Sequence, residues 1–151
     1  MDLRTAIYRY CNYQERCHSE VRNKLYELKA TTLEVNELLA ELVEADILNE
    51  ERYAKAYARG KFRIKEWGKV KIVAGLKAHQ VSDYCIRKGL QEIPDDEYEA
   101  TLAREAEKAL HRYRAIKPEW KQRATAHKYL LSHGWESGLI QKALKNVTGS
   151  V

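Results

Sequence analysis

Basic side chains recur along one stretch of the sequence at spacings that place them on one side of a helix. The series begins at Arg52 and continues through Lys55, Arg59 and Arg63. At 100° per residue these positions fall within an arc of about 80°. Guanidinium and ammonium groups arranged in this way can bind phosphate or carboxylate groups through charge-assisted hydrogen bonds. The spacing therefore predicts a basic ridge that meets an anionic partner, either nucleic acid or an acidic protein surface.

More basic residues continue this ridge past the sequence Trp67-Gly68. The predicted partner-binding or DNA-binding residues are Arg52, Lys55, Arg59, Lys61, Arg63, Lys65, Lys69, Lys71 and Lys77. The aromatic residues expected to support them are Tyr53, Tyr57, Phe62 and Trp67. The two tyrosines fall on a separate apolar arc and are expected to pack in the core. Trp67 suits packing and base stacking equally well.

Net charge is concentrated in the middle of the chain. Residues 1–51 hold 6 Lys or Arg against 11 Asp or Glu, a net charge of −5. Residues 52–88 hold 11 against 2, a net charge of +9, and residues 89–151 hold 10 against 9, a net charge of +1. Because so few acidic residues lie within the middle segment, we expect its charge to need an external partner.

The composition favours an all-α fold. The 151 residues include only 7 Gly and 2 Pro, and Ala, Leu, Glu, Lys and Arg are abundant, as in helices. One apolar pattern also occurs three times. A shift of 48 residues carries Leu33 onto Val81, and a further shift of 54 carries Val81 onto Trp135. A repeat of this length indicates stacked helical units, each of which needs a neighbour to complete its core.

Helix start signals divide each repeat into three helices. Thr31 and Glu34 form a capping-box sequence ahead of a helix expected over residues 33–45. Ser82 should cap a helix that ends near residue 90, and Gly134 should form the corresponding turn in the third copy. The first helices of the repeats are expected over residues 4–17, 50–65 and 97–116. The predicted organisation is an acidic repeat over 1–48, a strongly basic one over 49–93 and a third over 94–151.

Other chemistries have little support in the sequence. Cys11, Cys17 and His18 lack the short spacing of a zinc site, so Cys11 and Cys85 are expected to be small core residues. The five histidines are scattered, and neither a nucleophile motif nor a glycine-rich phosphate loop is present. We therefore expect a protein without catalytic residues or cofactors. The absence of a signal sequence and of a long apolar run favours a cytoplasmic location.

Several motifs resemble the RecX family of recombination regulators. The strongest resemblance is the run ILNEERYAKAYAR at residues 47–59, followed by Lys61-Phe62-Arg63, Glu66-Trp67-Gly68, Ile72 and Leu76. The opening YCNYQERCHSEV at residues 10–21 is similar to the start of Bacteroidetes-type members, and YLLSHGWE at residues 129–136 supports the third copy. The resemblance implies three tandem three-helix repeats of helix-turn-helix type, forming an elongated, curved rod.

The same resemblance implies a function in DNA repair, recombination and the SOS response. Members bind the RecA recombinase in the groove of its filament on single-stranded DNA and inhibit its ATPase, strand exchange and coprotease activities. A monomer that makes direct but secondary contact with DNA is expected. Two alternatives remain, namely a general DNA-binding module that acts without RecA and an adaptor for an unrelated acidic protein.

One turn departs from the family pattern. The second repeat has no glycine in its turn Lys77-Ala78-His79-Gln80, so His79 is expected to adopt the left-handed, helix-ending conformation. Gly75 lies inside the preceding predicted helix, where it should cost about 1 kcal/mol relative to alanine.

Overall fold

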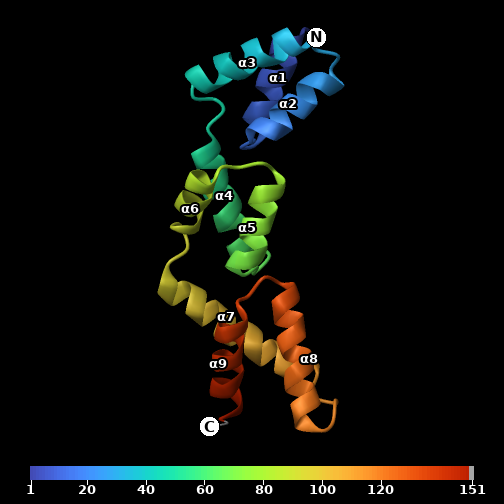
Figure 1. Cartoon of the computed structure of the whole chain (residues 1–151), viewed down its shortest axis with the longest axis vertical. Helices are drawn as coiled ribbons and strands as arrows, with labels where there is room; N and C mark the ends of the chain where they lie inside the picture. Colours follow the sequence, from blue (N-terminus) through green and yellow to red (C-terminus); the bar gives the residue numbers. More distant parts are fainter. Residues whose placement is uncertain (150–151) are drawn as a thin grey trace. The chain divides into compact units, whose positions relative to one another are not determined.

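A computed structural model describes residues 1–149, which form nine α-helices joined by short turns, and no strands. The all-α prediction is confirmed (Figure 1). The helices are α1 (Leu3–Tyr13), α2 (His18–Glu27), α3 (Thr32–Glu44), α4 (Glu50–Arg63), α5 (Lys69–Ala78), α6 (Asp83–Leu90), α7 (Asp95–Arg112), α8 (Glu119–Ser132) and α9 (Ser137–Thr148). None of the described helices is both long and apolar enough to span a bilayer.

Contacts divide the chain into two compact units. Unit 1 comprises Met1–Ala58 and Gly75–Glu92, and unit 2 comprises Arg59–Ala74 and the described residues from Ile93 onward. Both α4 and α5 contribute to each unit, so the described contacts group the middle segment with both of its neighbours. The predicted boundaries of the three repeats, at 48/49 and 93/94, stay a prediction.

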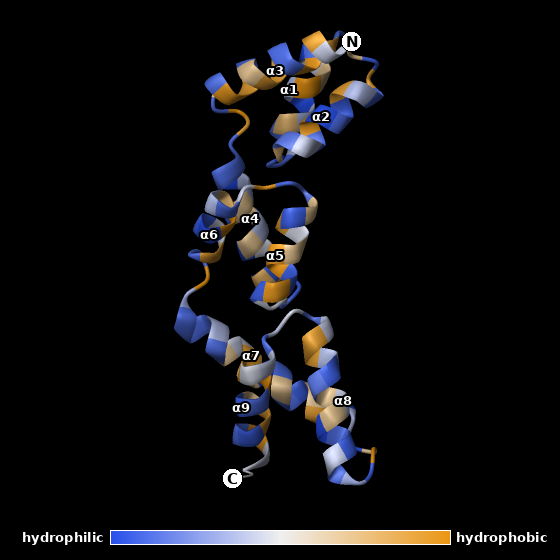
Figure 2. Cartoon of the chain, viewed as in Figure 1, coloured by the Kyte–Doolittle hydropathy of each residue, from blue (hydrophilic) through white to orange (hydrophobic). Residues whose placement is uncertain are grey.

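In unit 1 the helices α1, α2 and α3 enclose one apolar cluster. Its buried members are Ile7, Cys11, Val21, Leu25, Ala30, Val35, Leu38, Leu42 and Leu48. These residues recur at helical spacing, so each helix turns one apolar face inward and a polar face outward, as the alternating colours in Figure 2 show. Cys11 and Cys17 are both buried, whereas Cys85, expected in the core, is only half-buried.

In unit 2 the helix α7 packs against both α8 and α9. The buried side chains include Tyr98 and Leu102 from α7, Leu130 from α8, and Ile140 from α9. Trp135, in the turn before α9, is 1% exposed and its ring centroid lies 4.6 Å from that of Tyr98. The expectation that Trp135 is a packing residue is therefore confirmed.

The predicted helix starts are largely confirmed. The backbone N–H of Glu34 donates to Thr31 Oγ1 at 3.2 Å and that of Thr31 to Glu34 Oε1 at 2.8 Å, which completes the capping box. Ser82 caps α6 in the same way, accepting from Cys85 N at 3.2 Å. The first helix of each repeat ends earlier than expected, at Tyr13, Arg63 and Arg112.

Backbone hydrogen bonds in the repeated turns correct the alignment of the first copy. The N–H groups of Ala30, Val81 and Trp135 donate to the carbonyls of Leu25, Leu76 and Leu130 respectively. The second copy is thus related to the first by 51 residues, not 48, whereas the shift of 54 to the third copy is confirmed. Leu33, which the shift of 48 placed in the core, is 67% exposed. The shifts of 48 and 51 residues differ by nearly one helical turn. The wrong shift therefore still aligned apolar residues of the first copy with apolar residues of the second.

The turn of the middle copy also differs from the prediction. The residue with positive φ is Gln80 (61°), and not His79 as expected. Gln80 is the counterpart of Lys29 (71°) and Gly134 (91°) in the other two turns.

Gly75 is required by packing, because a Cβ there would lie 2.0 Å from the Tyr57 hydroxyl oxygen. The tyrosine ring lies against α5 where a larger residue would stand.

Candidate functional site

The predicted basic ridge is carried mainly by α4 and α5, and aromatic side chains lie beneath part of it. Tyr53 is 7% exposed and belongs to the core as expected, and Phe62, expected only to support the ridge, is 2% exposed. Tyr57, which was also expected in the core, is only half-buried, as is Trp67. Burial raises the pKa of the Tyr53 hydroxyl far above its ordinary value, so this side chain stays neutral.

Arg52, at the start of the ridge, is engaged in several contacts inside unit 1. Its guanidinium pairs with the Glu15 carboxylate through Nε and with Asp46 Oδ2 at 3.3 Å. It also donates to the backbone carbonyls of Asp46 at 3.0 Å and Ile47 at 3.1 Å. The hydrogen bond to Glu15 is the main cause that raises the pKa of Arg52. This arginine links α4 to the turn between α1 and α2 and to the turn between α3 and α4.

Two other members of the ridge have carboxylate partners. Lys55 Nζ lies 3.4 Å from Glu51 Oε2, one turn earlier on α4. Within unit 2, Arg63 lies against Glu97, with Nε 3.3 Å from Oε1 and a terminal nitrogen 3.4 Å from Oε2. The expectation that the ridge lacks compensating acids is therefore wrong for these positions, because their partners lie outside residues 52–88.

A different environment surrounds Trp67 in unit 2. The Nζ atoms of Lys61 and Lys71 lie 4.9 Å and 4.6 Å from the centre of its ring. We call Lys61, Trp67 and Lys71 the tryptophan–lysine cluster. Lys65 is exposed nearby in the chain, and within residues 1–149 neither Lys65 nor Lys71 forms an ion pair with a carboxylate. Glu66 is the acidic residue of this turn, and its Oε2 atom lies 3.8 Å from Lys108 Nζ.

The remaining ridge residues are spread over both units. Lys69 lies over the Tyr98 ring, with Nζ 4.6 Å from the ring centre. Arg59 is half-buried. Lys77 is exposed on α5 in unit 1, and Lys77 forms no ion pair with any described residue. Within unit 2 the ridge residues that lie together around an aromatic ring are those of the tryptophan–lysine cluster.

Two glycines fix the turn that carries Trp67. The backbone N–H of Gly68 donates to the His133 carbonyl at 2.8 Å, and that of Val70 donates to the Gly134 carbonyl at 3.0 Å. A Cβ at Gly68 would lie 2.3 Å from the Gly134 carbonyl oxygen. One at Gly134 would lie 2.3 Å from the Lys71 Cβ, and its φ of 91° also favours glycine. The start of α5 is thereby attached to the turn between α8 and α9.

Tyr98 also helps to attach the start of α5 to the turn between α8 and α9. Its hydroxyl accepts from the backbone N–H of Lys69 at 2.9 Å and donates to the Glu136 carboxylate. Burial, and then the hydrogen bond to Glu136, raise the pKa of Tyr98 far above its ordinary value. The tyrosine therefore remains a hydrogen-bond donor at physiological pH and holds α5, α7 and the start of α9 together.

All nine residues of the predicted ridge lie in one segment that is similar to a known family. Residues 49–90, which cover α4, α5 and α6, match the family described as RecX, second three-helix domain. The regulatory protein RecX of Bacillus mycoides (strain KBAB4) is 28% identical over 87 residues, which are 58% of this chain and 32% of that protein. Over this segment the chain is similar to RecX proteins. It spans about a third of the length of this curated relative.

Solved RecX structures share the fold. The crystal structure of RecX from Lactobacillus salivarius superposes with a TM-score of 0.85 at 23% identity, covering 97% of this chain and 94% of that one. A second crystal structure, of a regulatory protein RecX, gives a TM-score of 0.84 at 22% identity, with 94% and 73% covered. These likenesses establish that the nine described helices follow the RecX arrangement.

Sequence reasoning missed several residues that shape the site. Glu15 and Glu97 lie 37 and 34 residues in sequence from the basic residues that they neutralise, and Asp46, six residues from Arg52, lies outside the segment over which charge was counted. The contact between Gly68 and Gly134 joins positions 66 residues apart, so no local pattern could have indicated it. The RecX sequence Glu66-Trp67-Gly68 was the one available signal that this turn is specialised.

Proposed function

We propose that this chain regulates the RecA recombinase, mainly as an inhibitor. It binds along the groove of the RecA filament on single-stranded DNA and suppresses ATPase, strand exchange and coprotease activities, thereby modulating DNA repair and recombination. The match of residues 49–90 to the second three-helix domain of RecX and the similarity to a curated regulatory protein RecX support the partner. The observation that carries the mode of binding is the tryptophan–lysine cluster, where Lys61 and Lys71 lie over a half-buried ring, together with Lys65. Neither Lys65 nor Lys71 forms an ion pair with a described carboxylate.

The physical role of this surface is to meet carboxylates or phosphates of the filament. Lys65 and Lys71 gain charge partners only on binding, whereas Arg52 and Arg63 already have them within the fold. Unpaired lysines on a fixed turn lose less side-chain freedom on binding than lysines on a mobile loop. A protein of repeated units can make several weak contacts at once, which raises its avidity for neighbouring protomers.

The test is a RecA ATPase assay on single-stranded DNA with the recombinase of the same organism. The chain is titrated well below one copy per RecA protomer. We expect inhibition at these low ratios, and we expect excess DNA not to relieve it, because the target is the filament rather than free DNA. Absence of inhibition at every ratio, from a folded protein that still binds DNA, contradicts the proposal.

The second candidate is a general DNA-binding module that acts without RecA. The same cluster favours it, because lysines beside an aromatic ring suit phosphates and bases as well as carboxylates. This function predicts that inhibition follows the amount of DNA left uncovered and disappears when DNA is in excess. It also predicts equal inhibition of an unrelated ATPase that depends on single-stranded DNA, which serves as the control for both candidates.

A further inference from the structure

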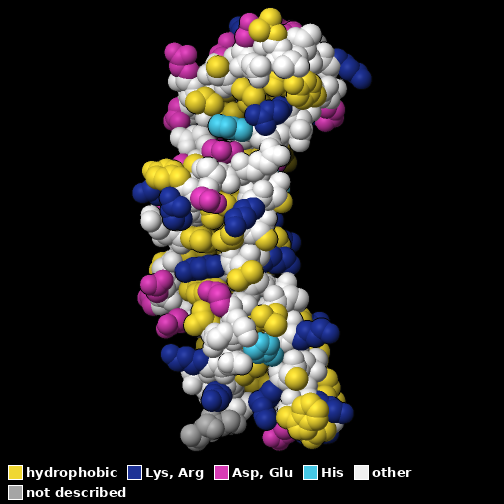
Figure 3. Space-filling model, in the orientation of Figure 1, with side chains coloured by type: hydrophobic (Ala, Val, Ile, Leu, Met, Phe, Trp, Pro, Cys, Tyr) yellow, Lys and Arg dark blue, Asp and Glu magenta, His cyan; other side chains and the backbone are white. Residues whose placement is uncertain are grey.

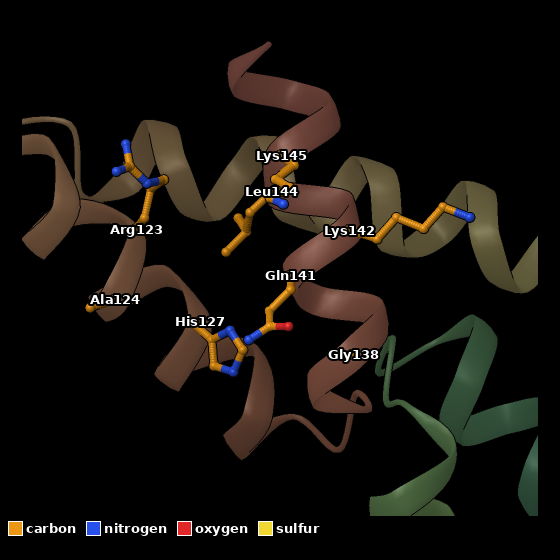
Figure 4. A pocket seen from close by; sticks show the side chains of 8 residues that line it. All are labelled: Arg123, Ala124, His127, Gly138, Gln141, Lys142, Leu144 and Lys145. Carbon is orange, nitrogen blue, oxygen red and sulfur yellow. The ribbon is translucent and has the colours of Figure 1, made fainter. Parts of the chain in front are cut away.

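A second basic surface lies within unit 2, in the groove between α8 and α9. The groove encloses about 970 Å³. Its lining residues are Arg123, Ala124 and His127 from α8, and Gly138, Gln141, Lys142, Leu144 and Lys145 from α9 (Figure 4). None of these residues belongs to the predicted ridge. The groove is a separate site that the middle of the chain does not account for.

Helical spacing explains why these residues share one groove. On α8, Arg123, Ala124 and His127 lie three, four and seven residues after Trp120, so all four positions occupy one face of the helix. On α9, Gln141, Lys142 and Lys145 stand in the same relation to Gly138. The two helices therefore turn equivalent faces toward the same space.

The middle of the groove is open and its floor is apolar. Leu144 is 5% exposed, and a Cβ added at Gly138 would meet no atom within 4 Å. In Figure 4 the His127 ring and the Gln141 amide extend toward one another between the helices, while Lys142 points away from α8. The His127 ring nitrogen Nε2 lies 3.1 Å from Ser137 Oγ. The polar groups available to a ligand are thus arranged along the two walls.

The groove carries positive charge without compensation. Its lining includes Arg123, Lys142 and Lys145 but no Asp or Glu, and none of the three has a carboxylate partner within residues 1–149. Over 119–151 the sequence holds 5 Lys or Arg against 2 Asp or Glu, a net charge of +3, whereas 89–118 holds 5 against 7, a net charge of −2. Around α8 and α9 in Figure 3, Lys and Arg side chains predominate over Asp and Glu. Because these two net charges nearly cancel, the net charge of residues 89–151 as a whole did not indicate that residues 119–151 are basic.

Trp120 indicates which kind of anion fits. Its side chain is 60% exposed, an unusual position for so large an apolar group. It does not line the groove itself, but helical spacing places it on the same face of α8 as Arg123 and His127, one and two turns before them. Binding of an acidic peptide would use only the cationic side chains of the groove and not the Trp120 ring. A single nucleic acid strand uses both features, because its phosphates pair with the cations and its bases stack on the ring.

We propose that the α8–α9 groove binds single-stranded nucleic acid. Arg123 and Lys145 contact phosphates, Lys142 contributes at the rim, and Trp120 stacks on a base at the α8 end. This goes beyond RecA regulation, because the contact is made by the chain itself and needs no recombinase.

The test measures binding of fluorescein-labelled oligothymidylate to the full chain by anisotropy, without RecA. We expect Arg123→Glu with Lys145→Glu to raise Kd at least tenfold. The salt dependence of log K should also become shallower by about 1.4, since each phosphate contact on a single strand contributes about 0.7. The matched control is Lys117→Glu with Lys128→Glu, which reverses two exposed charges outside the groove and should change Kd less than threefold.

Trp120 provides an independent readout. Trp120→Ala should weaken binding at least fivefold, in the range found for loss of one base stack. Tryptophan fluorescence should be quenched by the oligonucleotide in the wild-type chain and much less in Trp120→Phe, because Trp135 is buried and Trp67 lies elsewhere. Far-UV circular dichroism confirms that the variants fold.

Three results would overturn the proposal. They are equal weakening by the groove and control variants, unchanged binding by the groove variant, and stronger binding of polyglutamate than of oligothymidylate at equal charge. RecA ATPase inhibition is measured in parallel, so that loss of inhibition with intact DNA binding counts against the proposed function and not against the groove.

Discussion

Two basic regions of this chain use their charges in different ways. In unit 1, Arg52 is surrounded by Glu15, Asp46 and two backbone carbonyls. In unit 2, Lys61 and Lys71 lie over the Trp67 ring, and Lys71 has no ion pair with any described carboxylate. Both regions read as one ridge in the sequence. The comparison teaches that one basic stretch of sequence can divide, in the fold, into residues whose charges are matched and residues whose charges are left available to a partner.

The largest effect is expected from removing the support of the tryptophan–lysine cluster. Gly68→Ala places a methyl group 2.3 Å from the Gly134 carbonyl oxygen and strains two backbone hydrogen bonds. We expect the free energy of unfolding to fall by about 2–4 kcal/mol. The melting temperature should fall by about 5–15 °C. Urea and thermal unfolding, followed by circular dichroism, measure both quantities.

Gly60→Ala is the matched control for this substitution. Gly60 lies inside α4, and an added Cβ would meet nothing within 4 Å. Relief of the helix penalty of glycine should raise stability by up to about 1 kcal/mol. If Gly68→Ala and Gly60→Ala change stability in the same direction, the close contact between the two glycines does not exist in solution.

The sequence predicts local features of both regions well and distant ones poorly. The Thr31 capping box depends on neighbours in sequence and the burial of Tyr53 on helical period, and both were confirmed. The partners of Arg52 lie outside the segment over which charge was counted. The repeat shift was wrong by three residues for a related reason, because helical periodicity nearly repeats after one turn.

Charge reversal in the tryptophan–lysine region should separate binding from stability. Lys65→Glu with Lys71→Glu places acids where the filament is expected to present anions. The concentration needed for half-inhibition of RecA ATPase should rise at least tenfold, equivalent to about 1.4 kcal/mol. Stability should change little, because Lys65 is exposed and neither residue has a carboxylate partner within the described chain.

The control for this pair is again Lys117→Glu with Lys128→Glu, which changes the net charge by the same amount at other exposed positions. Near-equal loss of inhibition in both double variants would mean that overall charge, and not this surface, governs the interaction.

Arg52 should behave in the opposite way. Arg52→Gln removes its ion pairs and strands the Glu15 carboxylate, so the free energy of unfolding should fall by about 1–2 kcal/mol. Inhibition by the folded protein should stay within threefold of wild type. Lys55→Gln, which breaks one exposed pair on α4, should cost no more than about 0.5 kcal/mol. A large loss of inhibition in Arg52→Gln without loss of stability would place this arginine at the interface.

The smallest effect concerns the ionisation of Asp46. Its pKa is lowered from the ordinary value of 3.8, first by the hydrogen bond from Asn49 and then by the charge of Arg52. A carboxylate with a depressed pKa contributes stability that is present above pH 3.8 and is lost as the pH falls through the lower, folded value. Arg52→Gln should therefore raise the pKa of Asp46 only part of the way, because the bond from Asn49 remains.

Titration of the Asp46 carboxyl carbon by NMR measures this change directly. Asn49→Ser removes the amide donor but leaves a hydroxyl that can still cap α4 in place of Asn49 Oδ1. It should raise the pKa of Asp46 more than Arg52→Gln does. If Arg52→Gln leaves this pKa unchanged, the guanidinium does not act on Asp46 in solution. Arg52 would then have charge to offer a partner, and the contrast with the tryptophan–lysine cluster would be lost.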